Sequence, residues 1–248
     1  MKIIGSDYDG TLNHGGIDDI KRNAINKWRD AGNIFALVSG RGPEELLQIY
    51  EEKQFGCDYL IANNGAVILR PDGTVVSDIR CDGSISEPLL MLLFENGCPW
   101  GHVQTDFPCR IFADAADCKE PGEYSADNHP VIPYFNQIST LLPDFETASQ
   151  VTSVIKERFS AQLNPLQNGV CIDIVRADVN KAKGLYLLME MLGAEYDDII
   201  TVGDNINDRD MIAEFKSYAM ENGVDSIKKL ADYTISGITE LIEIELAK

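Results

Sequence analysis

The sequence predicts an α/β protein whose doubly wound parallel sheet is interrupted by an inserted α+β segment. Nearly continuous apolar runs alternate with helical patterns in residues 1–81 and again in residues 179–248. Such alternation is typical of right-handed βαβ units around a parallel sheet. Between residues 82 and 178 the alternation breaks down, and 248 residues are enough for a core with an inserted domain. We therefore expect a core of residues 1–81 and 179–248 and an insert of residues 82–178.

The elements of the expected core follow from apolar runs bounded by glycine, asparagine and proline. The Pro-Asp-Gly sequence at 71–73 is a turn signal and predicts a hairpin. The last two strands of the core are expected to lie beside the first as the fourth and fifth strands, in the order 3-2-1-4-5. The expected elements are strand 2–8, helix 18–31, strand 33–40, helix 43–53, strand 58–66, hairpin 67–80, helix 181–193, strand 198–203, helix 207–214, strand 217–220, helix 223–231 and a terminal helix.

The insert is less regular. Residues 89–96 and 146–159 have helical patterns, and three apolar runs predict strands at 110–115, 134–140 and 171–177. Much of the proline, glycine and asparagine lies in the segments 114–133 and 160–170, which we expect to be irregular.

Composition and charge exclude several classes of protein. The net charge is −19, from 21 basic and 40 acidic residues, which argues against nucleic acid or an anionic membrane as a partner. No apolar run is long enough to span a bilayer, and the first residues lack a secretory signal pattern, so we expect a cytoplasmic protein. The six cysteines form no CxxC pair and indicate reduced thiols rather than disulfides or zinc.

The stretch Ser6-Asp7-Tyr8-Asp9-Gly10-Thr11 carries the first functional signal. Residues i and i+2 of a strand point to the same side, so both carboxylates would face the crevice at the carboxyl end of a parallel sheet. A turn after the strand would explain Asp9 and Gly10. It does not explain the second acid, Asp7, inside the apolar run.

Two further stretches suggest groups that bind an anion. Ser39 and Gly40 end the second strand, where a hydroxyl could bind an anionic oxygen, although Ser-Gly is also ordinary strand-to-loop punctuation. Asn180 is expected to cap a helix that begins at Lys181, a position where the helix dipole disfavours a cation. A bound anion would remove this conflict. Lys183 is the alternative lysine, but it lies further into the helix.

The stretch Gly203-Asp204-Asn205-Ile206-Asn207-Asp208 follows another apolar strand and predicts a cation site. Its acids, with Asp210, offer the oxygen ligands that a hard divalent cation prefers. Asp210 by itself would be explained as an acidic residue at the amino end of a helix, where acids are common. Taken with the other stretches, a carboxylate nucleophile, a neighbouring acid/base, a hydroxyl, a lysine and Mg²⁺ describe phosphoryl transfer through an aspartyl-phosphate.

These motifs resemble those of the haloacid dehalogenase superfamily, whose DxDGT, Ser/Thr, Lys and GDxxND motifs all occur here in order. The local matches are Ser-Gly-Arg at 39–41, Asn-Gly-Ala at 64–66, Val-Asn-Lys at 179–181 and Gly-Asp-Asn-Ile-Asn-Asp at 203–208. The insert resembles the C2 cap of the Cof-type subgroup, which implies that residues 82–178 determine substrate specificity. Ala182 departs from the glycine that is common after the lysine.

The resemblance implies a role for each matching residue. Asp7 would attack phosphorus, and Asp9 would protonate the leaving alcohol and later activate water. The implied phosphate-binding residues are Thr11, Ser39, Gly40, Lys181 and Asn207. The implied Mg²⁺ ligands are Asp7, Asp9 through its backbone carbonyl, Asp204 and Asp208. Arg41 and Asn64 are implied substrate contacts.

The predicted function is therefore a Mg²⁺-dependent phosphatase that hydrolyses a small phosphate monoester, with a sugar phosphate as the substrate class implied by the subgroup. The predicted partner is a small phosphorylated metabolite, and the sequence assigns no oligomeric state. Two alternatives remain: a phosphomutase with the same chemistry, and a phosphoacceptor module of the receiver type. Asp9 distinguishes the last, because a stable phosphoacceptor does not need an acid for a leaving group.

Overall fold

The computed structural model describes residues 1–248 and divides the chain into two compact units. The core unit comprises residues 1–77 and 180–248, and the insert unit comprises residues 78–179. The insert begins earlier than the expected residue 82 because residues 78–81 are tied to it. The side-chain amide of Asn136 donates to the Asp78 carboxylate at 2.5 Å and to the Ile79 carbonyl at 2.9 Å.

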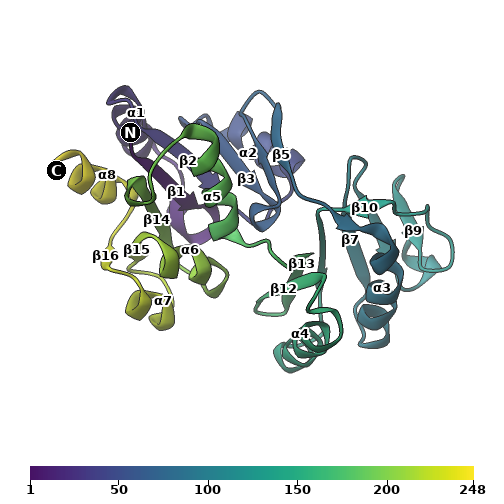
Figure 1. Ribbon diagram of the computed structural model, residues 1–248. Helices are drawn as coiled ribbons and strands as arrows, with labels where there is room; N and C mark the ends of the chain where they lie inside the picture. The colour runs from purple at the N-terminus through teal and green to yellow at the C-terminus, as the bar shows by residue number, and fades with distance from the viewer. The chain divides into compact units, whose positions relative to one another are not determined.

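The core unit contains an eight-stranded sheet in the order β16-β15-β14-β1-β2-β3-β4-β5 (Figure 1). All neighbours from β16 to β3 are parallel, and β4 is antiparallel to β3. This confirms the predicted order 3-2-1-4-5 and adds β16 beyond it. The strands are β1 (Ile3–Asp7), β2 (Ile34–Val38), β3 (Tyr59–Ala62), β4 (Val67–Leu69), β5 (Val75–Asp78), β14 (Ile199–Gly203), β15 (Lys216–Met220) and β16 (Tyr233–Ile235).

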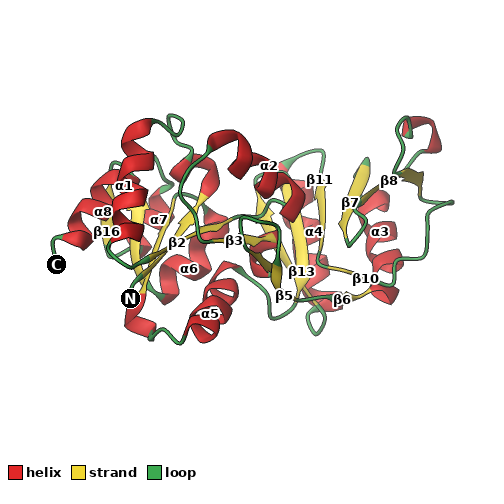
Figure 2. Ribbon diagram, turned by 90° about the horizontal axis from the view of Figure 1, so that it is seen from above, coloured by secondary structure: helices red, strands yellow, loops and turns green.

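Helices cover both faces of this sheet, which explains why its central strands are apolar throughout. All five residues of β1 are buried. Ile3 and Ile61 pack with residues of α5, α6 and α7 in one core cluster, whereas α1 packs on α8 and on β2. Figure 2 shows α1 and α2 on one side of the strands and α5 on the other. The helices are α1 (Asp19–Asp30), α2 (Pro43–Lys53), α5 (Lys181–Leu192), α6 (Arg209–Glu214), α7 (Asp225–Leu230) and α8 (Ile238–Leu246).

The expected core elements occur with small shifts, and three expectations were wrong. The strand expected at 58–66 ends at Ala62, because Asn63–Gly65 form the turn η2. The segment after α7 forms the short edge strand β16, where no strand was predicted. The helix expected at 207–214 begins instead as a 3₁₀ turn, η6 (Ile206–Asp208), and becomes α-helical only from Arg209. The side chain of Asp208 accepts the backbone N–H of Asn205, which closes this tight turn ahead of the helix.

The insert unit is an α+β domain with its own core. Its six-stranded sheet has the order β12-β13-β11-β7-β8-β9, and Val103, Ile138 and Ile174 of this sheet pack in one cluster with residues of α3 and α4. A small second sheet pairs β6 with β10. The elements are β6 (Cys81–Asp82), α3 (Ser86–Glu95), β7 (Trp100–Gln104), β8 (Cys109–Phe112), β9 (Glu123–Ser125), β10 (Tyr134–Phe135), β11 (Gln137–Leu141), α4 (Phe145–Phe159), β12 (Leu163–Asn168) and β13 (Cys171–Arg176).

Four strands of the insert were not predicted. The segment 160–170, expected to be irregular, contains β12, and β9 lies within 114–133, while β7 lies between α3 and β8. The two-residue strand β6, ahead of α3, was not predicted either. Pro165 lies inside β12 opposite Ile174. Proline is tolerated there because β12 is an edge strand, so the missing N–H leaves no ladder partner unpaired.

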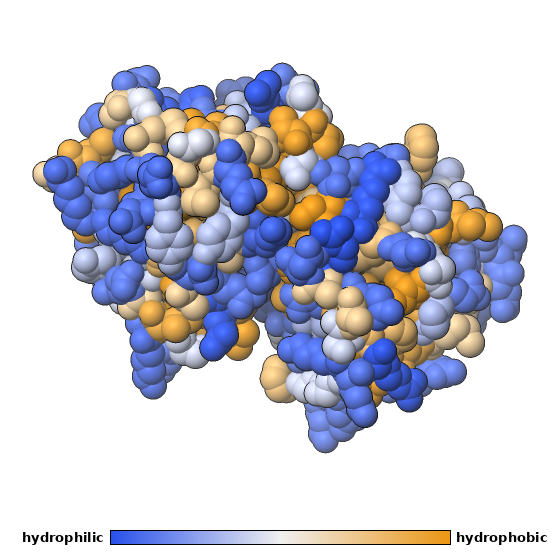
Figure 3. Space-filling model, in the orientation of Figure 1, coloured by the Kyte–Doolittle hydropathy of each residue, from blue (hydrophilic) through white to orange (hydrophobic).

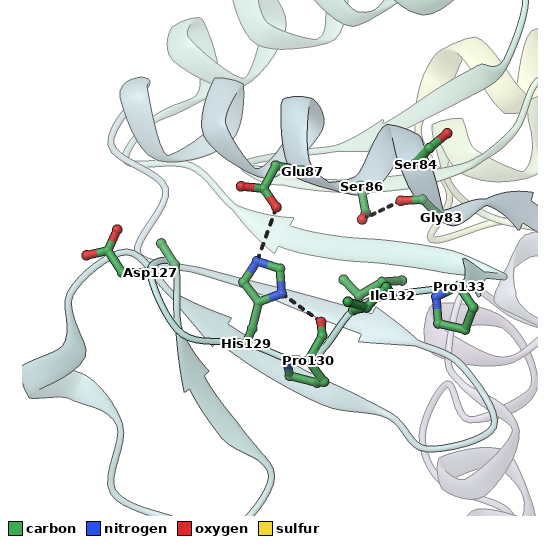
Figure 4. A pocket seen from close by; sticks show the side chains of 11 residues that line it. Gly83, Ser84, Ser86, Glu87, Asp127, His129, Pro130, Ile132 and Pro133 are labelled. Atoms are coloured by element: carbon green, nitrogen blue, oxygen red, sulfur yellow. Dashed lines mark hydrogen bonds and ion pairs between the residues drawn. The ribbon is translucent and has the colours of Figure 1, made fainter.

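The loop that connects β9 with β10 closes over the start of α3 and borders a cavity of about 490 Å³ (Figure 4). His129 donates through Nδ1 to the Pro130 carbonyl oxygen at 2.9 Å, and its Nε2 lies 3.6 Å from the Glu87 carboxylate. The Gly83 N–H donates to the Pro133 carbonyl oxygen at 3.1 Å. His129 therefore ties down a loop within the insert.

Hydrophilic residues dominate the surface that Figure 3 shows, and apolar residues appear there as scattered patches. No helix combines the length and the apolar character that a membrane crossing requires. All six cysteines are free thiols.

Candidate active site

Three neighbouring strands of the core sheet deliver the predicted motifs to one edge. β1 lies between β2 and β14 and ends at Asp7, which pairs in register with Val38, the last residue of β2. Ser39 follows β2 directly, and Asp204 follows the last residue of β14. The carboxyl ends of parallel strands meet at one edge, so the sheet topology brings the three side chains together.

Lys181 occupies the centre of the site, between two buried acids. Its Nζ lies 2.6 Å from Asp7 Oδ1 and 2.5 Å from Asp208 Oδ1, and only 1% of the residue is exposed. The helix α5 begins at Lys181 as predicted, because the Asn180 side chain accepts the backbone N–H of Lys183 at 2.8 Å. The ion pairs of Asp7 and Asp208 are both made with Lys181 and not with Lys183.

Burial shapes the electrostatics of this cluster. Burial, with the nearby Asp208 carboxylate, raises the pKa of Asp7 well above its usual value, while Lys181 acts in the opposite direction. Burial lowers the pKa of Lys181, but Asp208 and Asp7 outweigh it and raise the pKa overall. Lys181 is therefore a fixed positive charge. A second cation would help to keep Asp7 ionised.

Asp208 is oriented by the backbone. Its Oδ2 accepts the N–H of Asp204 at 2.9 Å and that of Asn205 at 3.1 Å, while Oδ1 is bound by Lys181. Gly203 passes directly beneath this carboxylate, since a Cβ at position 203 would lie 2.5 Å from Asp208 Oδ2. The Gly-Asp-x-x-Asn-Asp spacing is thus explained by a 3₁₀ turn that returns its last acid onto the backbone at its start.

Thr11 and Gly10 support Asp204. The Thr11 hydroxyl, which is completely buried, donates to Asp204 Oδ1 at 2.7 Å. Gly10 has a φ of 81°, and a Cβ there would lie 2.3 Å from Asp204 Oδ2. Only glycine fits both the left-handed conformation and the close approach. The hydroxyl of Thr11 thus orients an acid of the site, and the binding of phosphate by Thr11 stays a prediction.

The acids fit a hard divalent cation. One carboxylate oxygen from each of Asp7, Asp204 and Asp208 lies within 4.8 Å of the others. Burial also raises the pKa of Asp204, which a bound cation would counteract. An all-oxygen set of this kind suits Mg²⁺.

The exposed carboxylate of Asp9 is not one of these three acids and pairs with Arg41. Arg41 Nε lies 2.7 Å from Asp9 Oδ2, and its second terminal nitrogen lies 2.9 Å from Oδ1. Arg41 also pairs with Glu45. Arg41, predicted as a substrate contact, thus forms a two-point contact with the predicted acid/base.

The remaining predicted residues fall into two groups. Ser39 lies at the strand end with its hydroxyl accepting the Arg41 N–H at 3.2 Å, while Gly40 and Asn207 are half-buried in the turns that follow β2 and β14. Asn64, predicted to contact substrate, is completely buried, and its backbone N–H donates to the Ser39 carbonyl.

One supporting segment was not predicted. The turn after β15 meets the Asp9–Gly10 turn, because the Asn222 side chain donates to the Gly10 carbonyl oxygen at 2.9 Å. Next to it, the Val224 N–H donates to the Asp204 carbonyl oxygen at 2.9 Å. The only sequence signal was the Asn-Gly pair at 222–223, which marks a turn but does not identify its neighbour.

Comparison with known proteins places this fold and site in a family. A model of the haloacid dehalogenase-like hydrolases matches residues 4–240. The fold and the arrangement of acids around a lysine thus define a hydrolase. The chain belongs to the haloacid dehalogenase-like family, as its four motifs predicted.

Individual relatives are distant in sequence but similar throughout their length. The chain is 23% identical over 258 residues to a putative phosphatase of Buchnera aphidicola, covering 94% of this chain and 88% of the relative. A haloacid dehalogenase-like hydrolase from B. subtilis has a TM-score of 0.84 at 18% identity, covering 98% of this chain and 99% of that one. A sugar phosphatase of HAD subclass IIB has a TM-score of 0.80 at 16% identity, with both chains fully covered. The two structures show that the fold is shared.

Proposed function

We propose that the protein is a Mg²⁺-dependent phosphatase that hydrolyses a small phosphate monoester, of the sugar phosphate class, through an aspartyl-phosphate on Asp7. One observation carries this proposal. Asp7 ends the central strand of the sheet, where it is bound by Lys181 and lies beside two further acids. A purely structural ion pair would not need three acids around one lysine at the ligand-binding edge of an α/β sheet.

The free oxygen of Asp7 would attack phosphorus, and the bond to the leaving oxygen would break as it receives a proton from Asp9. Water would then attack the phosphorus of the aspartyl-phosphate after losing a proton to Asp9, which releases inorganic phosphate and restores Asp7. Both Asp9 oxygens accept from Arg41 in the structure. These contacts occupy one lone-pair site on each oxygen and leave a second site for the transferred proton.

Lys181 and the Ser39 hydroxyl would bind the phosphoryl oxygens, together with Gly40 and Asn207. Mg²⁺ would be bound by Asp7, Asp204 and Asp208, with the Asp9 backbone carbonyl, and it would offset charge on the phosphoryl group. The buried hydroxyl of Thr11 would fix the orientation of Asp204. The carboxyl ends of β1, β2 and β14 already lie at one edge of the sheet, so the site would form without rearrangement of the strands.

The insert is proposed as the cap that selects the leaving alcohol. Val103, Ile138 and Ile174 face the helices, so the alternate residues of these strands lie on the opposite face. His102, Ser139 and Asp173 form one cross-strand row on that face. Such hydrogen-bonding groups suit a hydroxyl-rich ligand. The structural similarity to a sugar phosphatase supports the same substrate class.

Hydrolysis of p-nitrophenyl phosphate tests the chemistry. We expect turnover with Mg²⁺, loss of turnover with a chelator, and no turnover in Asp7→Asn. Turnover that persists without metal, or in Asp7→Asn, would contradict the mechanism. Stoichiometric phosphorylation without turnover would identify a phosphoacceptor module, and an isomerised phosphate ester in place of inorganic phosphate would identify a phosphomutase.

A panel of sugar and nucleotide phosphates tests the substrate class. We expect the highest kcat/KM for a sugar phosphate. Ser139→Ala and Asp173→Asn should lower that value while leaving p-nitrophenyl phosphate hydrolysis unchanged. Equal losses for both substrates would show that the insert face does not select the alcohol.

A further inference from the structure

A short turn at the end of β3 has an unusual backbone. In η2 (Asn63–Gly65), Asn63, Asn64 and Gly65 have φ angles of 49°, 54° and 105°, so three successive residues lie in the left-handed region. L-residues rarely adopt this conformation, and asparagine tolerates it better than most. Such strain persists only where the surroundings impose it.

One side of this turn holds the Ser39 loop. The Asn63 N–H donates to the Arg41 carbonyl oxygen, and the Asn64 N–H donates to the Ser39 carbonyl oxygen, each at 2.9 Å. Both donors are backbone groups, so their direction is set by the left-handed conformation of the turn. The position of the Ser39 loop therefore depends on this conformation.

The other side of the turn touches the start of α5. A Cβ on Gly65 would lie 2.2 Å from the Asn180 carbonyl oxygen and 3.1 Å from the Gly184 nitrogen. A Cβ on Gly184 would lie 2.9 Å from the Gly65 Cα. The two backbones are thus in direct contact, one residue away from Lys181 on the helix.

The side chain of Asn63 indicates independently that this position requires a residue able to adopt the left-handed backbone conformation. The residue is 1% exposed, and neither its amide nitrogen nor its amide oxygen has a hydrogen-bond partner. Burial of an unpaired amide is unfavourable. Its presence here is explained by the tolerance of asparagine for the left-handed region.

From these contacts we propose that the Asn63–Gly65 turn is a positioning element that sets the distance between the Ser39 loop and Lys181, the two groups that would bind phosphate. The inference rests on the proposed phosphatase function. It predicts that small displacements of the turn weaken phosphate binding through the backbone contacts on its two sides.

The first test compares two glycines that both have positive φ. Gly65→Ala introduces a Cβ against α5, whereas Gly73→Ala introduces one whose nearest neighbour, a Leu47 methyl carbon, is 3.8 Å away. Both variants are strained by the same backbone conformation, so both should lower the Tm. We expect Gly65→Ala alone to raise the inhibition constant of inorganic phosphate, against p-nitrophenyl phosphate, by at least tenfold. A change of less than twofold in a folded Gly65→Ala protein would overturn the proposal.

A second test remains if Gly65→Ala does not fold. Gly184→Ala improves the propensity of α5 to be helical, yet its Cβ collides with Gly65. Gly237→Ala, at a helix start with nothing within 4 Å, is its control. We expect phosphate inhibition about tenfold weaker than in the wild type for Gly184→Ala, and inhibition equal to that of the wild type for Gly237→Ala. Equal inhibition in the two variants would contradict the positioning role.

A third comparison separates backbone from side chain. Asn63→Gly keeps the left-handed conformation and should retain phosphate inhibition within twofold, whereas Asn63→Val should weaken it about tenfold. Equal losses in both variants would assign the role to the amide and overturn the proposal. Calorimetric titration of the wild type with phosphate and Mg²⁺ measures phosphate binding without turnover, and so tests the positioning proposal separately from the proposed phosphatase function. Phosphate binding without turnover would reject the phosphatase, and calorimetric titration of the same variants with phosphate would then replace inhibition as the positioning test.

Discussion

At the scale of single residues, the buried cluster has more negative than positive groups. Asp7, Asp204 and Asp208 offer three carboxylates, and Lys181 is the cation bound to two of them. Buried charge without a partner is unfavourable. Burial, together with this imbalance, raises the pKa of Asp7 and Asp204, and the imbalance makes the cluster suitable for a divalent cation.

The first prediction concerns the identity of the functional lysine. Lys181→Met should lower kcat for p-nitrophenyl phosphate by about 10²–10³-fold, because an oriented charge that stabilises the transition state is lost. Lys183→Met, two residues along the same helix, should stay within about twofold. Steady-state kinetics of the two variants measures the difference, and a larger loss in Lys183→Met would reverse the assignment.

The second prediction concerns Thr11. Thr11→Val keeps the shape of the side chain but removes the hydroxyl that orients Asp204. The Mg²⁺ concentration for half-maximal turnover should rise about 10-fold or more, as for other groups that orient a metal ligand. Thr11→Ser retains the donor and should stay near the wild type. An unchanged Mg²⁺ requirement in Thr11→Val would show that Asp204 does not need this hydroxyl.

A site residue could be predicted from the sequence where its own neighbours in the chain indicate its role. Lys181 could be predicted because a cation at a helix amino end is misplaced without an anion. The contact of Asn222 with Gly10 could not, because it joins segments far apart in the chain. The burial of Asn64 was missed for a related reason. Its sequence neighbours do not show that its backbone N–H donates to the Ser39 carbonyl oxygen.

At the scale of elements, the C-terminal helix α8 is fixed by one buried acid. Glu245 accepts from Tyr218 at 2.5 Å and pairs with Lys216 at 2.7 Å and Lys248 at 2.5 Å. Lys2, next to β1, is 3.3 Å away. Burial raises the pKa of Glu245, but these hydrogen bonds outweigh it and lower the pKa to about 2.

This lowered pKa predicts an acid-sensitive contribution to stability. A carboxyl whose pKa is lower when folded stabilises the fold above its unfolded pKa, about 4.3, and loses this effect as the pH falls towards 2. Glu245→Gln should therefore be about 3 kcal/mol less stable at pH 7. Its difference from wild type should shrink between about pH 4.3 and pH 2.

Glu243→Gln, an exposed substitution in the same helix, is the control and should change little at either pH. Thermal unfolding from pH 7 to pH 2 measures the effect. If the difference in stability between Glu245→Gln and the wild type stays constant from pH 7 to pH 2, the ionised carboxylate does not contribute to stability.

Elements with strong periodicity were predicted well, and short strands were not. The strands β1, β2 and β14 are buried on both faces and read as apolar runs. β12 contains proline and asparagine, which a single sequence suggests as a loop. Its strand conformation comes from the ladder with β13, a tertiary interaction that overrides local preference.

At the scale of the whole molecule, the insert is one continuous segment with its own hydrophobic cluster. Residues 78–179 have the size of a small independent domain. We expect this segment, expressed alone, to unfold in one cooperative thermal transition with the circular dichroism of an α+β protein. A non-cooperative melt would show that the insert needs the core to fold.

The same division has an evolutionary consequence. Every acid of the site, the lysine and the turns that orient them belong to residues 1–77 and 180–248, while residues 78–179 interrupt the chain once. An ancestral gene could therefore lengthen, recombine or replace this segment without disturbing the catalytic geometry. If the insert selects the leaving alcohol as proposed, selection for a new substrate would act on one exchangeable module, and the chemistry would be inherited unchanged.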